Sequence, residues 1–287
     1  MTTTTDLPTS TAPEPHPSAR HESASAAGAG YLTTAATTAR RSVLKFFRTP
    51  QLLLMGTVQG ALFLFMFRYV FGGAISTGGA ISYVDFLVPG FIVTVILWTG
   101  MSSAAGVAED AATGVFDRLR SLPIPRSAVM LGRALADATL VTWGLLITSV
   151  LGFALGFRAH GSIGAVIGGF ALTIAAGFAF TWVFIYIGLI SGNAQAAQGM
   201  SMLVIPFSFV SSANVPIRSM PGWMQPFAAN QPVSVIINAV RSLMQGGTHV
   251  VGIPHTTTYW IVLSIVWCVG IMIVFGTLTT IRFSRTK

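Results

Sequence analysis

Any chemistry in this chain would depend on few ionisable side chains, because its 287 residues include only 16 Lys and Arg, 8 Asp and Glu and 5 His. The two lysines, Lys45 and Lys287, follow Leu and Thr, so no phosphate-binding loop ending in Gly-Lys-Ser/Thr is present. The histidines, at positions 16, 21, 160, 249 and 255, lack metal-ligand spacing with a carboxylate. We therefore expect no catalysis, no bound metal and no bound nucleotide.

The charged residues gather instead in two short segments, of which the longer is residues 109–126. It reads Glu-Asp-Ala-Ala-Thr-Gly-Val-Phe-Asp-Arg-Leu-Arg-Ser-Leu-Pro-Ile-Pro-Arg, with acids first and bases last. A short helix here would place Val115, Leu119 and Leu122 on one face. A turn between membrane helices does not need this much mixed charge, so the segment indicates a docking surface for a soluble partner. A solvated loop that follows the positive-inside rule is the alternative.

The second charged segment, residues 39–48, reads Ala-Arg-Arg-Ser-Val-Leu-Lys-Phe-Phe-Arg. On a helical wheel its Val, Leu and Phe side chains lie largely opposite its cations. That arrangement is typical of a helix lying in the membrane interface, with cations toward anionic headgroups. The sequence therefore predicts an N-terminal amphipathic interfacial helix, unless these cations only flank the first span. Its basic residues are Arg40, Arg41, Lys45 and Arg48.

The rest of the chain is apolar, with 53% hydrophobic and 8% charged residues and a mean hydropathy of +0.72. No Asp, Glu, Lys or Arg occurs in residues 86–108, 161–217 or 242–281. Because a spanning helix needs roughly 20 apolar residues, these runs predict an all-α integral membrane protein in a lipid bilayer. The net charge of +8 does not indicate nucleic-acid binding, since the basic residues flank apolar runs.

Six transmembrane helices are expected, at about 51–71, 82–108, 131–157, 164–190, 194–212 and 259–281. Residues 1–30 are rich in Thr, Ser, Ala and Pro and are expected to form a disordered cytoplasmic tail, with 31–287 as the membrane domain. With both termini cytoplasmic, only Arg68, Arg158, Arg218 and Arg241 lie outside, leaving twelve of the 16 basic residues inside. This bias predicts a multi-pass protein of the cell membrane with both termini inside.

Between the fifth and sixth spans, the sequence predicts a short extracellular helical cap. Trp223 and Phe227 lie in a proline-rich stretch suited to the membrane interface, and Val233–Gln245 follows as an amphipathic helix. About 13 residues are too few to span a bilayer. The helix would cap the outer mouth of a cavity or contact substrate.

Ion-coupled carriers usually display ionisable groups at mid-membrane depth. Here Asp85 and Asp137 fall near helix ends, and Arg133 is spaced to pair with Asp137. A secondary carrier is therefore disfavoured. An ion-coupled exporter, a non-transporting membrane scaffold and a membrane enzyme remain the alternatives.

Over residues 40–285 the chain resembles the ABC-2 family of exporter permeases, in particular its daunorubicin-resistance type. Three stretches carry the resemblance: Tyr83-Val-Asp-Phe-Leu-Val-Pro-Gly90; the 109–126 loop with Gly132, Arg133 and Asp137; and Pro221-Gly-Trp-Met-Gln-Pro with Asn230-Gln-Pro and Ala239-Val-Arg-Ser-Leu-Met-Gln-Gly246. Many members carry Glu-Arg-Glu where this chain has Glu109-Asp-Ala.

The resemblance implies outward transport of a bulky hydrophobic compound, a second permease, identical or different, and a dimer of cytosolic ABC ATPase subunits. ATP and Mg would bind to that partner and not to this chain. The 109 loop would couple ATPase to spans, and its coupling residues are expected to be Glu109, Asp110, Phe116, Asp117, Arg118, Leu119 and Arg120. Aromatic and thioether side chains on the second and fifth spans could line a cavity, unless they face lipid or pack the bundle: Trp98, Met101, Met202, Phe207 and Phe209.

Overall fold

The computed structural model describes residues 31–47, 50–75, 81–120 and 126–285. In those ranges the elements are helices and connecting turns, with no strand. In chain order they are α1 (Tyr31–Phe47), α2 (Pro50–Met66), the π-helix η1 (Phe67–Phe71), α3 (Tyr83–Ala112), α4 (Val115–Arg120), α5 (Arg126–Ala154), α6 (Ile163–Ile190), α7 (Ala194–Ser201), α8 (Val204–Phe209), the 3-10 turn η2 (Ile217–Ser219), α9 (Gln225–Asn230), α10 (Pro232–Met244), α11 (Thr248–Val251) and α12 (Thr257–Arg285). The expected disordered tail, 1–30, lies outside the described residues.

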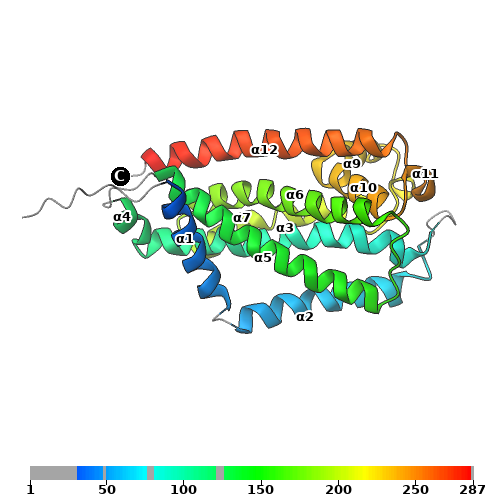
Figure 1. The fold of residues 1–287 in the computed structure, drawn as a ribbon, viewed down its shortest axis with the longest axis horizontal. Coiled ribbons are helices and arrows are strands. Elements are labelled where there is room, and N and C mark those ends of the chain that lie inside the picture. The colour runs from blue at the N-terminus through cyan, green and yellow to red at the C-terminus, as the bar shows by residue number, and fades with distance from the viewer. Residues whose placement is uncertain (1–30, 48–49, 76–80, 121–125, 286–287) are drawn as a thin grey trace, which may run out of the picture.

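Four helices are long and apolar enough to cross a membrane: α3, α5, α6 and α12. They lie lengthwise in one bundle (Figure 1), and the prediction of an all-helical membrane protein is confirmed in this form. The first expected span corresponds to α2 followed directly by η1. The fifth expected span is not one helix, because α7 ends at Ser201 and α8 begins only at Val204.

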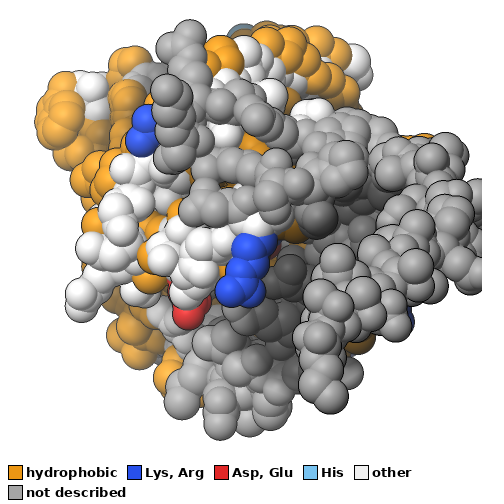
Figure 2. Space-filling view, turned by 90° about the vertical axis from the view of Figure 1, so that its left-hand side faces the viewer, with side chains coloured by type: hydrophobic (Ala, Val, Ile, Leu, Met, Phe, Trp, Pro, Cys, Tyr) orange, Lys and Arg blue, Asp and Glu red, His pale blue; other side chains and the backbone are white. Residues whose placement is uncertain are grey.

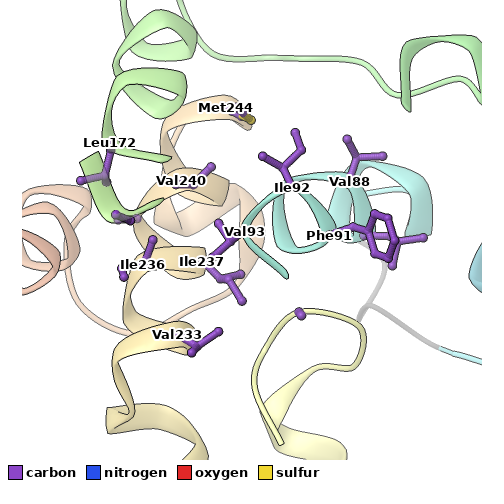
Figure 3. Packing of buried hydrophobic residues seen from close by; sticks show 14 of the residues in the cluster. Val88, Phe91, Ile92, Val93, Leu172, Val233, Ile236, Ile237, Val240 and Met244 are labelled. Atoms are coloured by element: carbon purple, nitrogen blue, oxygen red, sulfur yellow. The ribbon is translucent and has the colours of Figure 1, made fainter. Parts of the chain in front are cut away.

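The core of the bundle forms where α10 packs against α3, α6 and α12. Apolar side chains of α10, such as Ile236 and Val240, face Ile92 and Val93 of α3 (Figure 3). Small residues bring the long helices together: a Cβ on Gly177 of α6 would come 2.5 Å from Val141 of α5. Close packing of this kind favours one fixed arrangement of the four long helices.

The two ends of the bundle differ in what they carry (Figure 1). At one end, here named the α4 end, lie α1, α4 and the C-terminus of α12. At the other, the α10 end, lie α10, α11 and the connections around residues 72–82 and 155–162. Figure 2 looks onto the α4 end and shows basic and acidic side chains on it, with hydrophobic side chains toward its edges.

Helix α1 crosses α5 at the α4 end (Figure 1). Gly132 permits this contact, because a Cβ there would come 2.6 Å from the carbonyl oxygen of Ala35 and 2.7 Å from Cβ of Thr38. The amphipathic segment expected at 39–48 is therefore the second half of a longer helix that begins at Tyr31. Arg48 and the side chains of Arg41 and Lys45 lie outside the described residues.

Candidate functional site

Helix α4 is the centre of the expected coupling segment, and its Phe116 anchors it to the bundle. The chain turns into α4 through Gly114, whose φ of +70° is one that residues with a side chain rarely adopt. Phe116 is 6% exposed and meets Phe283 of α12 edge to face, with ring centroids 5.4 Å apart. The same apolar cluster includes Val107 of α3, Met130 of α5 and Ile185 of α6. One short helix is thereby joined to the ends of four long ones.

A polar network beside this cluster ties α3 to α5. Arg133 of α5 donates from Nη1 to Asp110 of α3 at 2.8 Å, and its Nε lies 3.3 Å from Asp137. Nη2 of Arg133 also donates to the carbonyl oxygen of Ser103, whose hydroxyl donates to Asp137. The expected Arg133–Asp137 pair is therefore present, and Asp110 adds a second carboxylate from another helix. Two acids compensate one buried cation, as buried charges require.

The other expected coupling residues divide between anchoring and exposure. Glu109 and Arg118 are exposed at the α4 end, and Leu119 is half-buried against the Phe116 cluster. Arg40 of α1 is also exposed at this end. The side chains of Asp117 and Arg120, although within α4, lie outside the described ones. The α4 end thus combines a fixed apolar anchor with exposed charges of both signs.

The five residues expected to line a cavity do not lie together. Trp98 packs inside the bundle, with its ring centroid 4.8 Å from that of Phe63 of α2, and Met101 is partly buried nearby. Met202, Phe207 and Phe209 lie instead on the broken α7–α8 segment and are about half exposed, at 54%, 48% and 45%. The break therefore presents an apolar surface, with Leu203 at 69% exposure in its middle.

Comparison with known proteins agrees with this geometry. The ABC-2 type transporter family matches residues 34–244. The chain belongs to this family. It is 34% identical over 86% of its length to the daunorubicin resistance ABC transporter permease protein DrrB1 of Streptomyces coeruleorubidus, covering 84% of that protein. It is 26% identical over 75% of its length to the doxorubicin resistance ABC transporter permease protein DrrB of Mycobacterium tuberculosis, covering 74%.

The resemblance seen in the sequence is thereby confirmed, and the chain is a membrane permease of the ABC exporter type, a transport subunit. More distant similarity extends to the putative transport permease ycf38 of Pyropia yezoensis, at 26% identity over 71% of this chain and 70% of that protein. The permease has a further polar site, at its α10 end, that the sequence reasoning missed.

That site is a row of polar side chains on α10 and at its N-terminus. Positions 231, 234, 238, 241 and 245 fall on one face of a helix, and all five side chains are buried. They are Gln231, Ser234, Asn238, Arg241 and Gln245. The seven-residue spacing of 231, 238 and 245, and of 234 and 241, was the sequence signal that could have revealed them. Arg241 had been assigned to the outer side only as a charge.

Proposed function

We propose that this permease is the transmembrane half of an ATP-driven exporter that moves a bulky hydrophobic compound out of the cell. A pair of separate ATPase subunits, which bind ATP and Mg, would drive it from the cytoplasm, and a second permease would complete the pathway. The observation that carries the proposal is the Phe116 anchor, which joins an exposed, charged helix to the ends of α3, α5, α6 and α12. Force applied at α4 would reach all four helices.

The proposal assigns six membrane crossings and places the α4 end in the cytoplasm. Helix α2 and η1 together cover 22 residues, 50–71, and pack beside α3 and α5, which supports a crossing there. Helices α7 and α8 would make the remaining crossing as a discontinuous helix, a common device in transporters. Both termini are then cytoplasmic, in agreement with the positive-inside rule. Helix α1 would lie in the inner interface, and α10 would cap the outer side.

Coupling would proceed through α4 and α1 together. In the proposal Glu109, Arg118, Asp117 and Arg120 face the ATPase, while Phe116 and Leu119 hold α4 against the bundle. The Arg133 network makes the ends of α3 and α5 move as one piece, and α1 adds its own contact to α5 at Gly132. Two-state movement of packed helices is the usual way in which such a local push is amplified.

The transported compound would follow the apolar surface of α7 and α8. Met202, Leu203, Phe207 and Phe209 offer thioether and aromatic surface that can adapt to varied hydrophobic ligands. Two relatives carry names that refer to resistance to daunorubicin and doxorubicin. An amphipathic polyaromatic drug of that kind is therefore the substrate class that we propose to test first.

Reversal of the charges on α4 tests the coupling role. The double variant Asp117→Arg/Arg120→Glu should still insert into membranes, because neither change removes the Phe116 anchor. It should lose drug export and recovery of a vanadate-sensitive ATPase with the purified permease. Arg158→Ala, at the opposite end of the bundle, is the matched control and should retain both.

Three outcomes would contradict the proposal. Normal export and ATPase recovery in the double variant would remove the coupling role. Export that survives ATP depletion but stops with the proton gradient would establish an ion-coupled carrier. A permease whose deletion changes no transport would be a scaffold.

A further inference from the structure

The break in the α7–α8 segment leaves backbone carbonyls that a continuous helix would have satisfied. Helix α8 covers only Val204–Phe209, and the turn that follows, residues 210–214, is largely buried. The last carbonyls of a helix have no partner within it, and a buried carbonyl without a partner is costly. Irregular backbone persists at membrane depth only where neighbouring protein groups satisfy it.

Helix α10 supplies those partners from its row of polar side chains. The amide Nε2 of Gln231 donates to the carbonyl oxygens of Phe207 at 3.1 Å and Val210 at 2.9 Å. Seven and ten residues further along the chain, the next two contacts meet Ser212: its hydroxyl donates to Asn238, and its carbonyl oxygen accepts from Arg241 at 2.7 Å. Four carbonyl groups after the middle of α8 are thus bound by side chains of one helix, the fourth being that of Ala213.

Arg241 is the centre of this arrangement. Its side chain is completely buried, and besides Ser212 and Ala213 it donates from Nε to the carbonyl oxygen of Phe86, at the start of α3, at 2.9 Å. Its guanidinium carbon lies 3.7 Å from the centre of the Phe86 ring. A planar guanidinium with several donors suits this task, whereas a lysine ammonium on a flexible stem cannot reach three carbonyls in the same way. A cation at a helix C-terminus also opposes the negative end of the helix dipole.

Gly90 of α3 makes room for this contact. A Cβ at that position would come 2.8 Å from both Cα of Ala213 and Nη2 of Arg241. The hydroxyl of Tyr83, one turn before Phe86, donates to the carbonyl oxygen of Asn214 at 3.1 Å. Helix α3, the turn after α8 and α10 therefore meet at one point, with no bulky side chain between them.

We propose that Arg241 and Gln231 cap the broken end of α8 and make α8 and α10 a single outer gate. The inference rests on the proposed export function, since a gate needs a pathway. The apolar surface of α8 lines that pathway, and the hinge is the interruption at Met202 and Leu203, where α7 ends. Contacts of Arg241 with Phe86 hold the gate against α3 in its closed position. Arg241 is thus a positioning residue, which acts on the compound through α8.

Hydrogen–deuterium exchange of the whole permease in lipid nanodiscs tests the cap without any transport. Arg241→Lys keeps the charge and loses the fork of donors, and it should speed amide exchange in residues 204–214 about tenfold or more. Gln231→Ala removes only the bonds to Phe207 and Val210 and should speed exchange there severalfold. Exchange in α6 should stay at the wild-type rate in both variants. Arg158→Lys, an exposed arginine at the same end, is the matched control and should change neither region.

The gate itself is tested by the number of drug molecules exported per ATP hydrolysed by the assembled transporter. A loosened gate should lower this ratio at least severalfold in Arg241→Lys while ATP hydrolysis continues. Wild-type exchange rates in both Arg241→Lys and Gln231→Ala would overturn the proposal, as would faster exchange with an unchanged ratio. Should Arg241→Lys fail to fold, Gln231→Ala decides both measurements. Absence of export by the wild-type transporter would refute the proposed function, and the exchange rates would still decide the cap.

Discussion

The permease buries two arginines, one at each end of the bundle, and it stabilises them in opposite ways. At the α4 end, Arg133 lies between the carboxylates of Asp110 and Asp137. At the α10 end, Arg241 donates to three backbone carbonyls and covers the ring of Phe86. Among the described residues no carboxylate forms an ion pair with Arg241. The first is a charge network between helices, and the second is a cap on the backbone.

The difference teaches what each end is built to do. A cation between two acids on two helices fixes the spacing of those helices, because separating them would leave buried charge unpaired. A cation on neutral carbonyls can be released at lower cost, since the groups left behind are only polar. The α4 end therefore transmits movement as a stiff unit, and the α10 end is the end that can open. This is the comparison that the following variants break or sharpen.

The largest loss of stability is expected from Arg133→Ala, because it leaves Asp137, which is 4% exposed, as an unpaired buried acid. Breaking a buried pair from one side typically costs roughly 3–5 kcal/mol of folding free energy. The free energy of unfolding in mixed micelles with SDS measures the effect. In the Arg133→Ala background, Asp137→Ala should restore part of the loss. A cost under about 1 kcal/mol would show that the network is not a stiff link.

A smaller loss is expected from Arg241→Met, which keeps the apolar stem and leaves only neutral carbonyls without a donor. Hydrogen bonds from a charged group contribute about 1.5–3 kcal/mol, and removal of a buried charge offsets part of that. The same unfolding measurement should therefore place Arg241→Met below Arg133→Ala. The reverse order would contradict the distinction between a network and a cap.

Two glycines give a matched pair that probes the same contrast. A Cβ on Gly90 would meet the backbone of Ala213, whereas a Cβ on Gly106 would come 2.8 Å from the flexible end of the Arg133 side chain. We expect Gly90→Ala to cost about 1–3 kcal/mol, as overpacking usually does, and Gly106→Ala to cost less. Thermal unfolding midpoints of the two purified variants measure the difference. Equal midpoints would show that the α10 end has more room than its contacts indicate.

The smallest change in stability is expected at Glu109, which is exposed at the α4 end. Glu109→Gln should alter the free energy of unfolding by no more than about 0.5 kcal/mol, the usual range for surface substitutions. It should nevertheless weaken ATPase recovery with the permease, since we assign this acid to the docking surface. Loss of stability in step with loss of ATPase would assign Glu109 to the fold instead.

The sequence predicted the long helices well because each is an uncharged run bounded by charges or turn residues. Helix α6 was expected at 164–190 and is Ile163–Ile190, and α10 was expected at 233–245 and is Pro232–Met244. The Arg133–Asp137 pair followed from i,i+4 spacing. The match to the ABC-2 type transporter family supports the functional assignment drawn from the same residues.

Other features depend on contacts between segments far apart in the chain, which periodicity does not encode. The break after Ser201 follows no proline or glycine at that point, so the fifth span read as continuous. Phe116 was recognised as apolar, but its burial depends on Phe283, more than 160 positions away. Arg241 looked like an exposed outer charge, because its carbonyl partners lie on α3 and on the turn after α8. Trp98 was assigned to a cavity, and its neighbour Phe63 could not be foreseen.

The most direct test of the account is drug movement in sealed vesicles that contain the purified permease with and without its ATPase subunit. A fluorescent anthracycline would report transport, with ATP or a proton gradient supplied in turn. We predict transport only when permease, ATPase and ATP are all present, and none from the permease alone under either energy source. Gradient-driven transport by the permease alone would contradict the claim that its energy enters from a partner at the α4 end.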